Sequence, residues 1–385
     1  MAPSRVLVVG SGAIGLRTAV ELLRRNVEIS LVSPFSPLHE STCSQGAGGL
    51  WMPFHCNENR VDRWSKETLN ELYPMAKDSS NTLVESLSCV VMKQSHSGPL
   101  IEDFLASDYD LGTGGKSTIP LWTKDERIEF QHLTAEMLHW QNTIYNLKIP
   151  SQEAMIGSKY QYAWHFKTPV VDAPNMLKFM LREIQNHKNT AYLNVETNQY
   201  YRSIDEIANI AKTLDCDAVV NCTGLGSREL CQDDLVVGAR GILLHFDRKK
   251  SIRTFKRSDN SPLTNDAVIL VEEGPWGNES HPCYLIPRGD VLVVGGTYLE
   301  GDDNKSITPQ ERELLLEKAQ ILGIDVKASP PIGEWVGFRP SRKIAKCEVD
   351  KSVSDLQIVH SYGYGGSGWT VSVGVAKETA KLLNV

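Results

Sequence analysis

The sequence predicts an α/β protein of two lobes, one built around a parallel sheet and the other around an antiparallel sheet. Three segments lead to this prediction. The apolar run Arg5–Val9 passes directly into a glycine cluster and a helical pattern, and the segments 218–226 and 359–370 also combine a strand with a glycine-rich turn. Ligands of parallel sheets bind at the carboxyl ends of the strands. We therefore expect segments from both ends of the chain to build one lobe.

The glycine cluster after the first strand has the spacing G-x-G-x-x-G. Gly10 permits a tight turn, Gly12 lets a pyrophosphate approach the backbone, and Gly15 lets the helix pack on the strand. The N–H groups at the helix start face the phosphates, so Ser11 and Ile14 are also expected beside the cofactor. Strand, glycines and helix together predict a dinucleotide site without choosing between NAD and FAD. An ordinary glycine turn is the alternative.

The second predicted strand, 28–32, ends at Ser33-Pro34, where an acidic residue usually holds the ribose hydroxyls. The next carboxylate is Glu40, beyond the expected position. Ser33 is the remaining candidate for a ribose hydrogen bond, which is weaker than one to a charged acceptor.

Length and charge exclude several classes of protein. At 385 residues the chain is too long for one simple core, and its net charge of −7 argues against nucleic acid and anionic membranes as partners. No apolar run approaches the roughly 20 residues that span a bilayer. The first strand leaves no room for a signal peptide, so an intracellular location is expected. The last residues, 382–385, are not a Ser-Lys-Leu peroxisomal signal.

The eight cysteines show neither C-x-x-C nor zinc-site spacing, so no metal site is expected. Most are expected to be buried thiols. Cys231 and Cys283 form one candidate disulfide pair, although free thiols are favoured in a chain of this size.

Other segments follow from local patterns. A loop of small residues at 41–53 is suited to wrapping a flat ligand. We expect a mostly helical stretch at 59–92, polar loops over 95–125, a helix after Pro174, antiparallel strands at 239–247 and 267–271 with a charged loop between them, a hairpin of 284–287 with 291–294, and a closing helix that runs to Leu383.

In this order, the segments resemble the D-amino-acid oxidase family, which includes the D-aspartate oxidases. The resemblance covers nearly the whole chain. Besides the generic dinucleotide motif, it is carried by Ala47-Gly-Gly-Leu-Trp51-x-Pro53, Val220-Asn-Cys-Thr-Gly224, Tyr284-Leu-Ile-Pro287, Gly337-Phe-Arg339-Pro-x-Arg342 and His360-x-Tyr-Gly-Tyr-Gly-Gly366.

The resemblance implies a Rossmann-type FAD-binding lobe built from discontinuous segments, 1–75, 168–235 and 333–385. It implies an antiparallel-sheet substrate-binding lobe over 76–167 and 236–332. It further implies non-covalent FAD, a homodimer, and oxidative deamination of a D-amino acid by hydride transfer from Cα to flavin N5. The products are a 2-oxo acid, ammonia and hydrogen peroxide. The flavin carries the redox chemistry and the protein orients the substrate.

Three residues are expected to hold the substrate. Arg339 stands beside the rigid Pro340, and its guanidinium matches a carboxylate geometrically; the resemblance points to the same residue. Tyr284 resembles the tyrosine that binds the same carboxylate, and the carbonyl of Gly366 resembles the acceptor of the substrate amino group. The alternatives are a surface arginine and a core tyrosine. Arg342 is expected to form a structural ion pair.

The closing helix is expected to direct its N-terminal partial positive charge at the flavin pyrimidine edge. Thr370 resembles the residue that hydrogen-bonds this edge. The resemblance places further cofactor contacts at Thr42, Cys43, Ser44, Gly48, Gly49, Leu50, Tyr201, Thr223, Gly224, Arg339, Gly365, Gly366, Ser367, Gly368 and Trp369.

The sequence departs from the family pattern around the pocket. Ser280 stands where vertebrate members carry a second tyrosine on a lid, and Trp276 is a candidate to fill that gap. Ser367 replaces a tyrosine of some members, and Met52 replaces a polar residue that can touch the substrate. These changes favour a roomier pocket and a broad oxidase of neutral D-amino acids.

An acidic substrate is the main alternative, because Arg253, Lys256 and Arg257 in the charged loop are candidates to bind a side-chain carboxylate. Leu225-Gly-Ser-Arg-Glu-Leu230 also resembles D-aspartate oxidases. A glycine or sarcosine oxidase shares the cofactor lobe but is not expected to carry the whole C-terminal signature. A nicotinamide dehydrogenase and a non-catalytic flavin protein leave the Arg339 segment unexplained.

Overall fold

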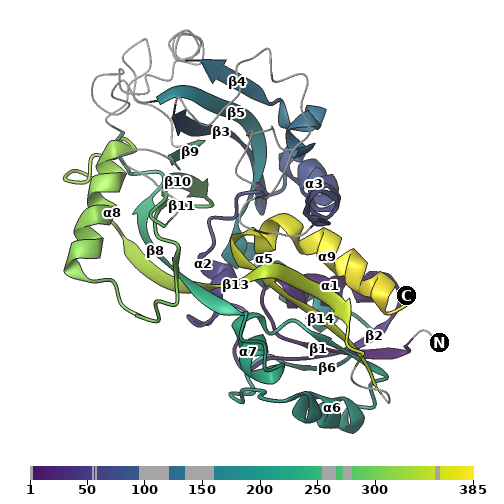
Figure 1. Cartoon of the computed structure of the whole chain (residues 1–385). Coiled ribbons are helices and arrows are strands. Elements are labelled where there is room, and N and C mark those ends of the chain that lie inside the picture. Colours follow the sequence, from purple (N-terminus) through teal and green to yellow (C-terminus); the bar gives the residue numbers. More distant parts are fainter. Residues whose placement is uncertain are drawn as a thin grey trace.

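The structure is a computed structural model that describes residues 3–53, 56, 59–94, 121–134, 160–253, 266–271, 280–351 and 356–385. Its described strands form one 14-stranded mixed sheet in the order β4-β5-β3-β9-β10-β11-β8-β13-β14-β7-β1-β2-β6, with β12 paired to β8 (Figure 1). The strands are β1 Arg5–Val9, β2 Glu28–Val32, β3 Val84–Gln94, β4 Gln131–Thr134, β5 Tyr160–Val171, β6 Thr190–Asn194, β7 Ala218–Asn221, β8 Val237–Asp247, β9 Ala267–Val271, β10 Cys283–Arg288, β11 Val291–Gly295, β12 Leu299–Glu300, β13 Gly333–Val349 and β14 Gln357–Tyr364. The α-helices are α1 Ala13–Arg24, α2 Cys43–Gly46, α3 Val61–Lys77, α5 Ala173–Asn186, α6 Ile204–Thr213, α7 Ser227–Leu230, α8 Pro309–Ile321 and α9 Gly368–Leu382.

One half of the sheet is parallel and is assembled from distant parts of the chain. Strands β14, β7, β1, β2 and β6 lie side by side and all pair in parallel. Val6 and Val8 of β1 pack in one core with α1 and α5, whereas Leu7 and Val9 pack with α6 on the other face. Because both faces are covered, all four residues after Arg5 in β1 are apolar. The expectation that segments from distant parts of the chain build one parallel sheet is confirmed.

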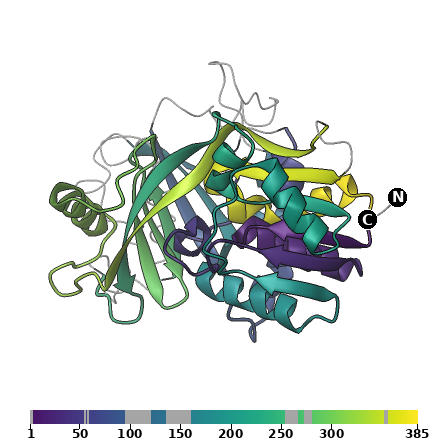
Figure 2. The ribbon, with the colours of Figure 1, turned by 90° about the horizontal axis from the view of Figure 1, so that it is seen from below.

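The other half is mainly antiparallel. Strands β8, β11, β10 and β9 pair antiparallel in that order, and α8 packs against them through Leu315, Ala319 and Leu322. Helix α8 begins with a capping box of Thr308 and Glu311, which satisfies two backbone N–H groups. In both ribbon views α8 lies on the side of the molecule away from the two termini (Figures 1 and 2).

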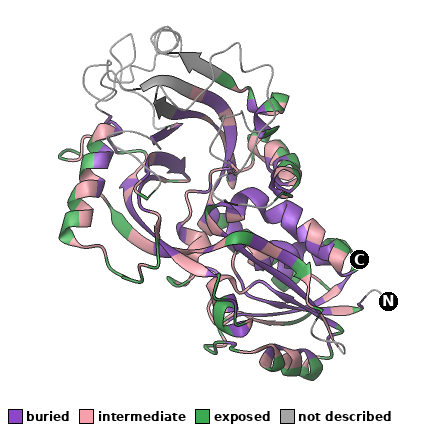
Figure 3. Ribbon diagram, viewed as in Figure 1, coloured by how far each residue is buried: buried purple, intermediate pink, exposed green. Residues whose placement is uncertain are grey.

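Strand β13 joins the two halves. It pairs with β8 over Gly333–Ser341 and with β14 at Ser341 and again over Lys346–Val349, so the sheet runs without a break from one half to the other. Buried residues concentrate on the strands, while α6 and the outer side of α8 carry exposed residues (Figure 3). In the described ranges, no helix combines the length and the apolar character needed to cross a membrane.

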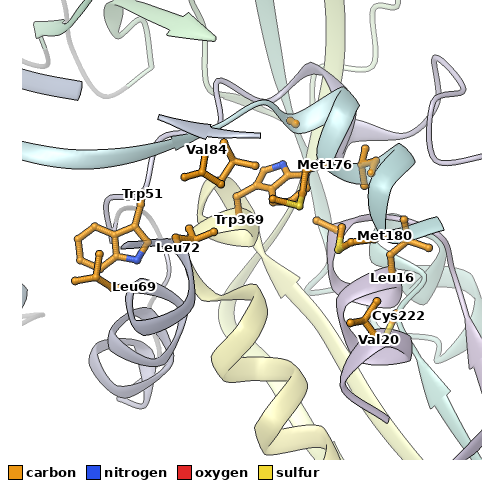
Figure 4. Close-up of a cluster of buried hydrophobic side chains, with 14 of the residues drawn as sticks. Leu16, Val20, Trp51, Leu69, Leu72, Val84, Met176, Met180, Cys222 and Trp369 are labelled. Atoms are coloured by element: carbon orange, nitrogen blue, oxygen red, sulfur yellow. The ribbon is translucent and has the colours of Figure 1, made fainter. Parts of the chain in front are cut away.

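The main core lies where α1, α3, α5 and α9 meet the sheet. Trp369 of α9 lies between Val84 of β3 and Met176 of α5, and Trp51 lies beside Leu69 of α3 (Figure 4). Trp51 and Trp369 are 1% and 6% exposed. The loop that contains Trp51 is therefore anchored in the same core as the last helix.

One expectation from the sequence is wrong, and a candidate disulfide, which was the less favoured alternative to free thiols, does not form. The stretch 59–92 is not mostly helical: α3 ends at Lys77, and Val84–Gln94 forms β3, which pairs along its length with β5. The spacing of apolar residues within 59–92 could not reveal strand β3, because its partner strand β5 lies far along the chain. No disulfide joins Cys231 and Cys283, since all eight cysteines are free thiols. Cys283 is buried in the core beneath α8, and Cys231 lies beside His360.

Candidate functional site

The first glycine turn has the geometry that its motif predicts. Gly10 has φ of +111°, and a Cβ there would come within 2.5 Å of the Cys222 carbonyl oxygen. A Cβ on Gly15 would collide with the carbonyl of Gly10. A Cβ on Gly12 would meet only Ser44 Oγ within 4 Å, so the backbone there borders open space. Gly12 itself offers no side-chain cap, whereas Ser44 Oγ accepts from the N–H of Ala13 at 3.0 Å, and the first turn of α1 holds no acidic residue. This helix start fits a phosphate.

At the end of β2, Ser33 is buried and its hydroxyl is already engaged. Ser33 Oγ donates to the carbonyl of Phe35 at 2.9 Å and lies 3.0 Å from Ser11 Oγ. Tyr201 is also buried, with its hydroxyl 3.1 Å from Thr197 Oγ1. Burial raises its pKa.

The neighbouring Tyr200 is 56% exposed, and its ring lies edge-on to Phe35. Phe35 in turn stacks on His39 with 4.3 Å between the ring centroids. The aromatic surface at the ends of β2 and β6 is therefore formed by Tyr200, Phe35 and His39, of which sequence reasoning named none.

The turn after β7 is fixed by a buried polar network. Thr223 donates through N and Oγ1 to Asn221 Oδ1, at 3.1 and 2.8 Å. The amide of Asn221 lies 3.3 Å from His360 Nδ1, and His360 Nε2 lies 3.0 Å from Asp350 Oδ2. Burial lowers the pKa of His360. The network places Thr223 and the left-handed Gly224 beside the Gly10 turn.

The small-residue loop at 41–53 is tied to three parts of the fold. Thr42 Oγ1 donates to the carbonyl of Ser36, and Trp369 Nε1 donates to the carbonyl of Ser44 at 3.0 Å. Arg288 of β10 is buried and donates to the carbonyls of Gln45 and Ala47. The α2 segment that contains Cys43 is thus held by both sheet halves.

The glycines of this loop allow close approach of the chain. Gly49 has φ of +77°, and a Cβ there would collide with the carbonyl of Val171. A Cβ on Gly48 would come within 2.5 Å of Ile286 Cδ1, and Leu50 forms a β-bridge with Val170. The loop therefore lies flat against β5 and β10.

The start of α9 is open. Gly365 has φ of +53°, and a short 3-10 turn, Gly365–Ser367, leads into α9. A Cβ on Gly368 would meet nothing within 4 Å, and one on Gly366 only Arg339 Cδ at 3.8 Å. No side chain caps α9 and no acidic residue lies in its first turn. This turn, like that at Gly12, leaves space beside its glycines, and the first N–H groups of a helix carry a partial positive charge.

Thr370 ties α9 to the small-residue loop. Its Oγ1 accepts from the N–H of Met52 at 3.2 Å and can donate to the Met52 carbonyl at 3.1 Å. Met52 and Ser367 are both buried. The Thr370 hydroxyl, which was expected at the flavin pyrimidine edge, is therefore hydrogen-bonded to the backbone of Met52.

Arg339 lies on β13 at the edge of the open space beside Gly366. Its Nη1 donates to the carbonyl of Thr297 at 2.9 Å, and its Cζ lies 5.2 Å from the ring centroid of Tyr298. Tyr298 is oriented in turn by a 3.2 Å hydrogen bond to Ser341 Oγ. Sequence reasoning missed Thr297 and Tyr298, although the Gly295-Gly296 pair directly before them marks a close approach of backbone.

Tyr284 and Cys43 lie in the same electrostatic environment as Arg339. Burial raises the pKa of Tyr284, and the charge and hydrogen bonding of Arg339 oppose that rise. Burial likewise raises the pKa of Cys43 to about 11 against the effect of Arg339. A Cβ on Gly295 would come within 2.5 Å of the Tyr284 hydroxyl, so a glycine is needed there. The fold thus brings Tyr284, Arg339 and Gly366 together.

Arg253, named from the sequence as a candidate to bind a side-chain carboxylate, lies within the fold and not on an exposed loop. Arg253 is 4% exposed and donates to the carbonyl of Leu322, just beyond α8. Burial lowers its pKa to about 10. Lys256, Arg257 and Trp276 lie outside the described residues.

Two further residues near the site are described. Ser280 is exposed, and its carbonyl accepts from the N–H of Tyr298 at 2.7 Å. The structural ion pair expected of Arg342 is confirmed, since its Nε donates to Asp233 Oδ2 at 3.0 Å.

Comparisons with known proteins agree with this geometry. Residues 5–382 match the DAO family, described as FAD dependent oxidoreductase. The chain is 26% identical to a D-amino-acid oxidase of Rubrobacter xylanophilus over 98% of this chain and 95% of that protein. It is 24% identical to a human D-aspartate oxidase over 100% of this chain and 96% of that protein.

Solved structures share the fold. Glycine oxidase from Bacillus cereus superposes with a TM-score of 0.67 at 17% identity, covering 99% of this chain and 95% of that one. An FAD-bound L-α-glycerophosphate oxidase from Mycoplasma pneumoniae also superposes with a TM-score of 0.67, at 13% identity. This match covers 100% of this chain and 95% of that one. The two open helix starts fit the pyrophosphate and ring of the cofactor that the family uses. The chain belongs to the DAO family of FAD-dependent oxidoreductases and has their Rossmann-type fold.

Proposed function

We propose that the chain is an FAD-dependent oxidase that oxidatively deaminates D-amino acids, preferentially those with neutral side chains. The D-amino acid, oxygen and water give the 2-oxo acid, ammonia and hydrogen peroxide. The observation that carries the proposal is the position of Arg339, whose guanidinium is oriented by Thr297 and Tyr298 at the edge of the open space beside Gly366.

Arg339 binds the substrate carboxylate in this proposal, because a planar guanidinium pairs with both carboxylate oxygens. The Tyr284 hydroxyl donates to the same carboxylate. Its raised pKa keeps it protonated at neutral pH and therefore able to donate. The carbonyl of Gly366 accepts from the amino group, which fixes the direction of Cα–H.

Bound FAD supplies hydride acceptance from Cα–H and reoxidation by oxygen. The residues proposed to hold it are the Gly10–Gly15 turn at the pyrophosphate, the 42–50 loop and the start of α9. The open N–H groups of α9 stabilise negative charge that develops near them during hydride transfer. The same arrangement supports the division of the chain into a cofactor lobe and a substrate lobe at the boundaries expected from the sequence.

The preference for neutral side chains rests on what surrounds Arg339. Tyr298, which contacts Arg339, is uncharged, as are Met52, Ser280 and Ser367, the other residues expected at the substrate. Arg253, a candidate for binding an acidic substrate, donates to the carbonyl of Leu322 instead. An oxidase of D-aspartate or D-glutamate is the second candidate, supported by the similarity to the human D-aspartate oxidase. A glycine or sarcosine oxidase is the third candidate, supported by the fold shared with the glycine oxidase from Bacillus cereus.

A substrate panel tests the proposal. The purified holoenzyme is given D-alanine, D-methionine, D-phenylalanine, D-aspartate, D-glutamate, their L-forms, glycine and sarcosine, and peroxide release is measured. We expect peroxide from the neutral D-forms. Peroxide only from D-aspartate and D-glutamate favours the acidic alternative, and peroxide only from glycine or sarcosine favours the third. No peroxide from any of them contradicts the function.

A further inference from the structure

Lys318 on α8 is a buried cation outside the site described above. Its side chain is 3% exposed. Its Nζ donates to three backbone carbonyls, those of His281 at 3.2 Å, Pro282 at 2.9 Å and Gly296 at 2.9 Å. An ammonium group has three donors, so these bonds use its full capacity.

The three carbonyls belong to the two segments that carry the substrate residues. Pro282 lies two residues before Tyr284, and Gly296 directly precedes Thr297, whose carbonyl orients Arg339. The segments also bind each other, since Gly296 N donates to the Pro282 carbonyl and Tyr298 N donates to the Ser280 carbonyl, both at 2.7 Å. Lys318 lies at the junction of these contacts.

The charge of Lys318 is costly for the fold. None of the ion pairs found among the described residues includes it, and burial lowers its pKa to about 8, with only Cys283 acting in the opposite direction. Its neighbours Leu315 and Ala319 on α8, and Leu322 just beyond the helix, pack in an apolar core. An apolar side chain of similar length would avoid the desolvation penalty. Such a side chain would, however, leave the carbonyls of His281 and Gly296 without this donor, so the favourable part of the Lys318 interaction lies in its contacts with these two segments.

We propose that Lys318 is a positioning residue of the substrate-carboxylate site, acting through the backbone of 281–282 and 296 to hold Tyr284, Thr297 and hence Arg339 in register. The inference rests on the proposed role of Arg339 in binding the substrate carboxylate. Lys318 itself touches neither substrate nor cofactor. Loss of its ammonium frees the two segments to shift, and the guanidinium loses its fixed orientation.

Carboxylate binding without turnover is the appropriate measurement. Pyruvate, the 2-oxo acid of D-alanine, is titrated into the FAD-loaded enzyme, and its Kd is read from the change in visible flavin absorbance. Four variants are compared with the wild type: Lys318→Met, Arg339→Met, the double variant, and Arg253→Met. The last removes a similarly buried cation that donates to the carbonyl of Leu322, just beyond α8. Tm is measured for each.

We expect Lys318→Met to raise the Kd about threefold to tenfold, while Arg253→Met leaves it unchanged at a similar or larger loss of Tm. In the double variant, Lys318→Met should raise the Kd by a smaller factor than it does in the wild type, because the part of its effect that acts through Arg339 is already lost. Lys318→Gln, which keeps two N–H donors, should recover part of the affinity. If Lys318→Met does not fold, Lys318→Gln replaces it in the comparison with Arg339→Met and the double variant, and a smaller rise in Kd is expected.

An unchanged Kd in Lys318→Met, or effects of Lys318 and Arg339 that simply add, would overturn the inference. An equal loss of affinity in Arg253→Met would do the same, since it would reveal a general effect of stability. If Arg339→Met itself does not weaken pyruvate binding, the proposed function fails instead. The two failures are therefore distinguishable.

Discussion

Gly241 and Arg339 face each other so closely that position 241 accepts no side chain without displacing the guanidinium. A Cβ on Gly241 would come within 2.5 Å of Arg339 Nη1 and 2.8 Å of its Cζ. Arg339 lies on β13 and Gly241 on β8, and the two strands pair antiparallel over nine residue pairs. The orientation of the proposed carboxylate ligand is therefore set partly by the absence of a side chain on the neighbouring strand.

Gly241→Ala is expected to raise KM for a D-amino acid by about tenfold or more, which corresponds to about 1.4 kcal/mol of lost binding. The end of an arginine side chain can move, so Tm should change little. Gly238→Ala on the same strand is the control, because its Cβ would make an ordinary 3.6 Å contact with Phe338 Cβ. Steady-state kinetics with equal KM for the two variants would contradict the expected role of Gly241.

Removing the Arg339 guanidinium should weaken substrate binding directly. A hydrogen bond to a charged group contributes about 1.5–3 kcal/mol, so Arg339→Met is expected to raise KM about tenfold to a hundredfold. Arg342→Met, three residues along the same strand, removes the ion pair with Asp233 instead. It should lower the free energy of unfolding and leave KM unchanged. The prediction is wrong if both variants alter KM alike.

Gly12→Ala should reduce FAD affinity without unfolding the chain. The added Cβ would meet only Ser44 Oγ, at 3.2 Å, but would occupy the space in which a pyrophosphate approaches the backbone. We expect the Kd for FAD to rise about tenfold or more, measured by fluorescence titration of the apoprotein, with Tm of the apoprotein nearly unchanged. Gly333→Ala, whose Cβ would lie at 3.8 Å from His245, serves as the control and should bind FAD normally.

Stability should fall in acid through Glu311. The hydrogen bonds and charge of Arg240, together with the N-terminal cap at Thr308, lower the pKa of Glu311 to about 2 from an ordinary value of 4.5. A carboxylate with a lowered pKa in the folded state stabilises the fold above pH 4.5, and this contribution is lost as the pH falls toward 2.

Chemical denaturation between pH 2 and 6 checks the effect of Glu311. The wild type should lose more stability over this range than Glu311→Gln does. Glu313→Gln, an exposed position on the same helix, should behave like the wild type. Parallel pH profiles for the wild type and Glu311→Gln would show that the carboxylate contributes nothing.

Much of the cofactor side of the protein was predictable from the sequence. The apolar runs of β1 and β7, the positive-φ glycines at 10 and 365, and the helices after them are local features, since strand period, glycine conformation and helix spacing are written within a dozen residues. The hairpin of β10 and β11 was also predicted, because its turn lies within the same short segment.

What the sequence by itself determined is the parallel sheet, its glycine turns and the family, and it singled out Arg339 as the candidate ligand of a substrate carboxylate. The tertiary structure alone decided that 84–94 is a strand, that Arg253 binds Leu322, and that Tyr298 and Gly241 flank Arg339. It also decided that Lys318 joins the two segments behind the proposed site. The physical reason is that each of these features depends on contacts between residues far apart in the chain. Local periodicity carries no record of such partners, because the same side chain can be buried, paired or exposed according to what the fold brings beside it.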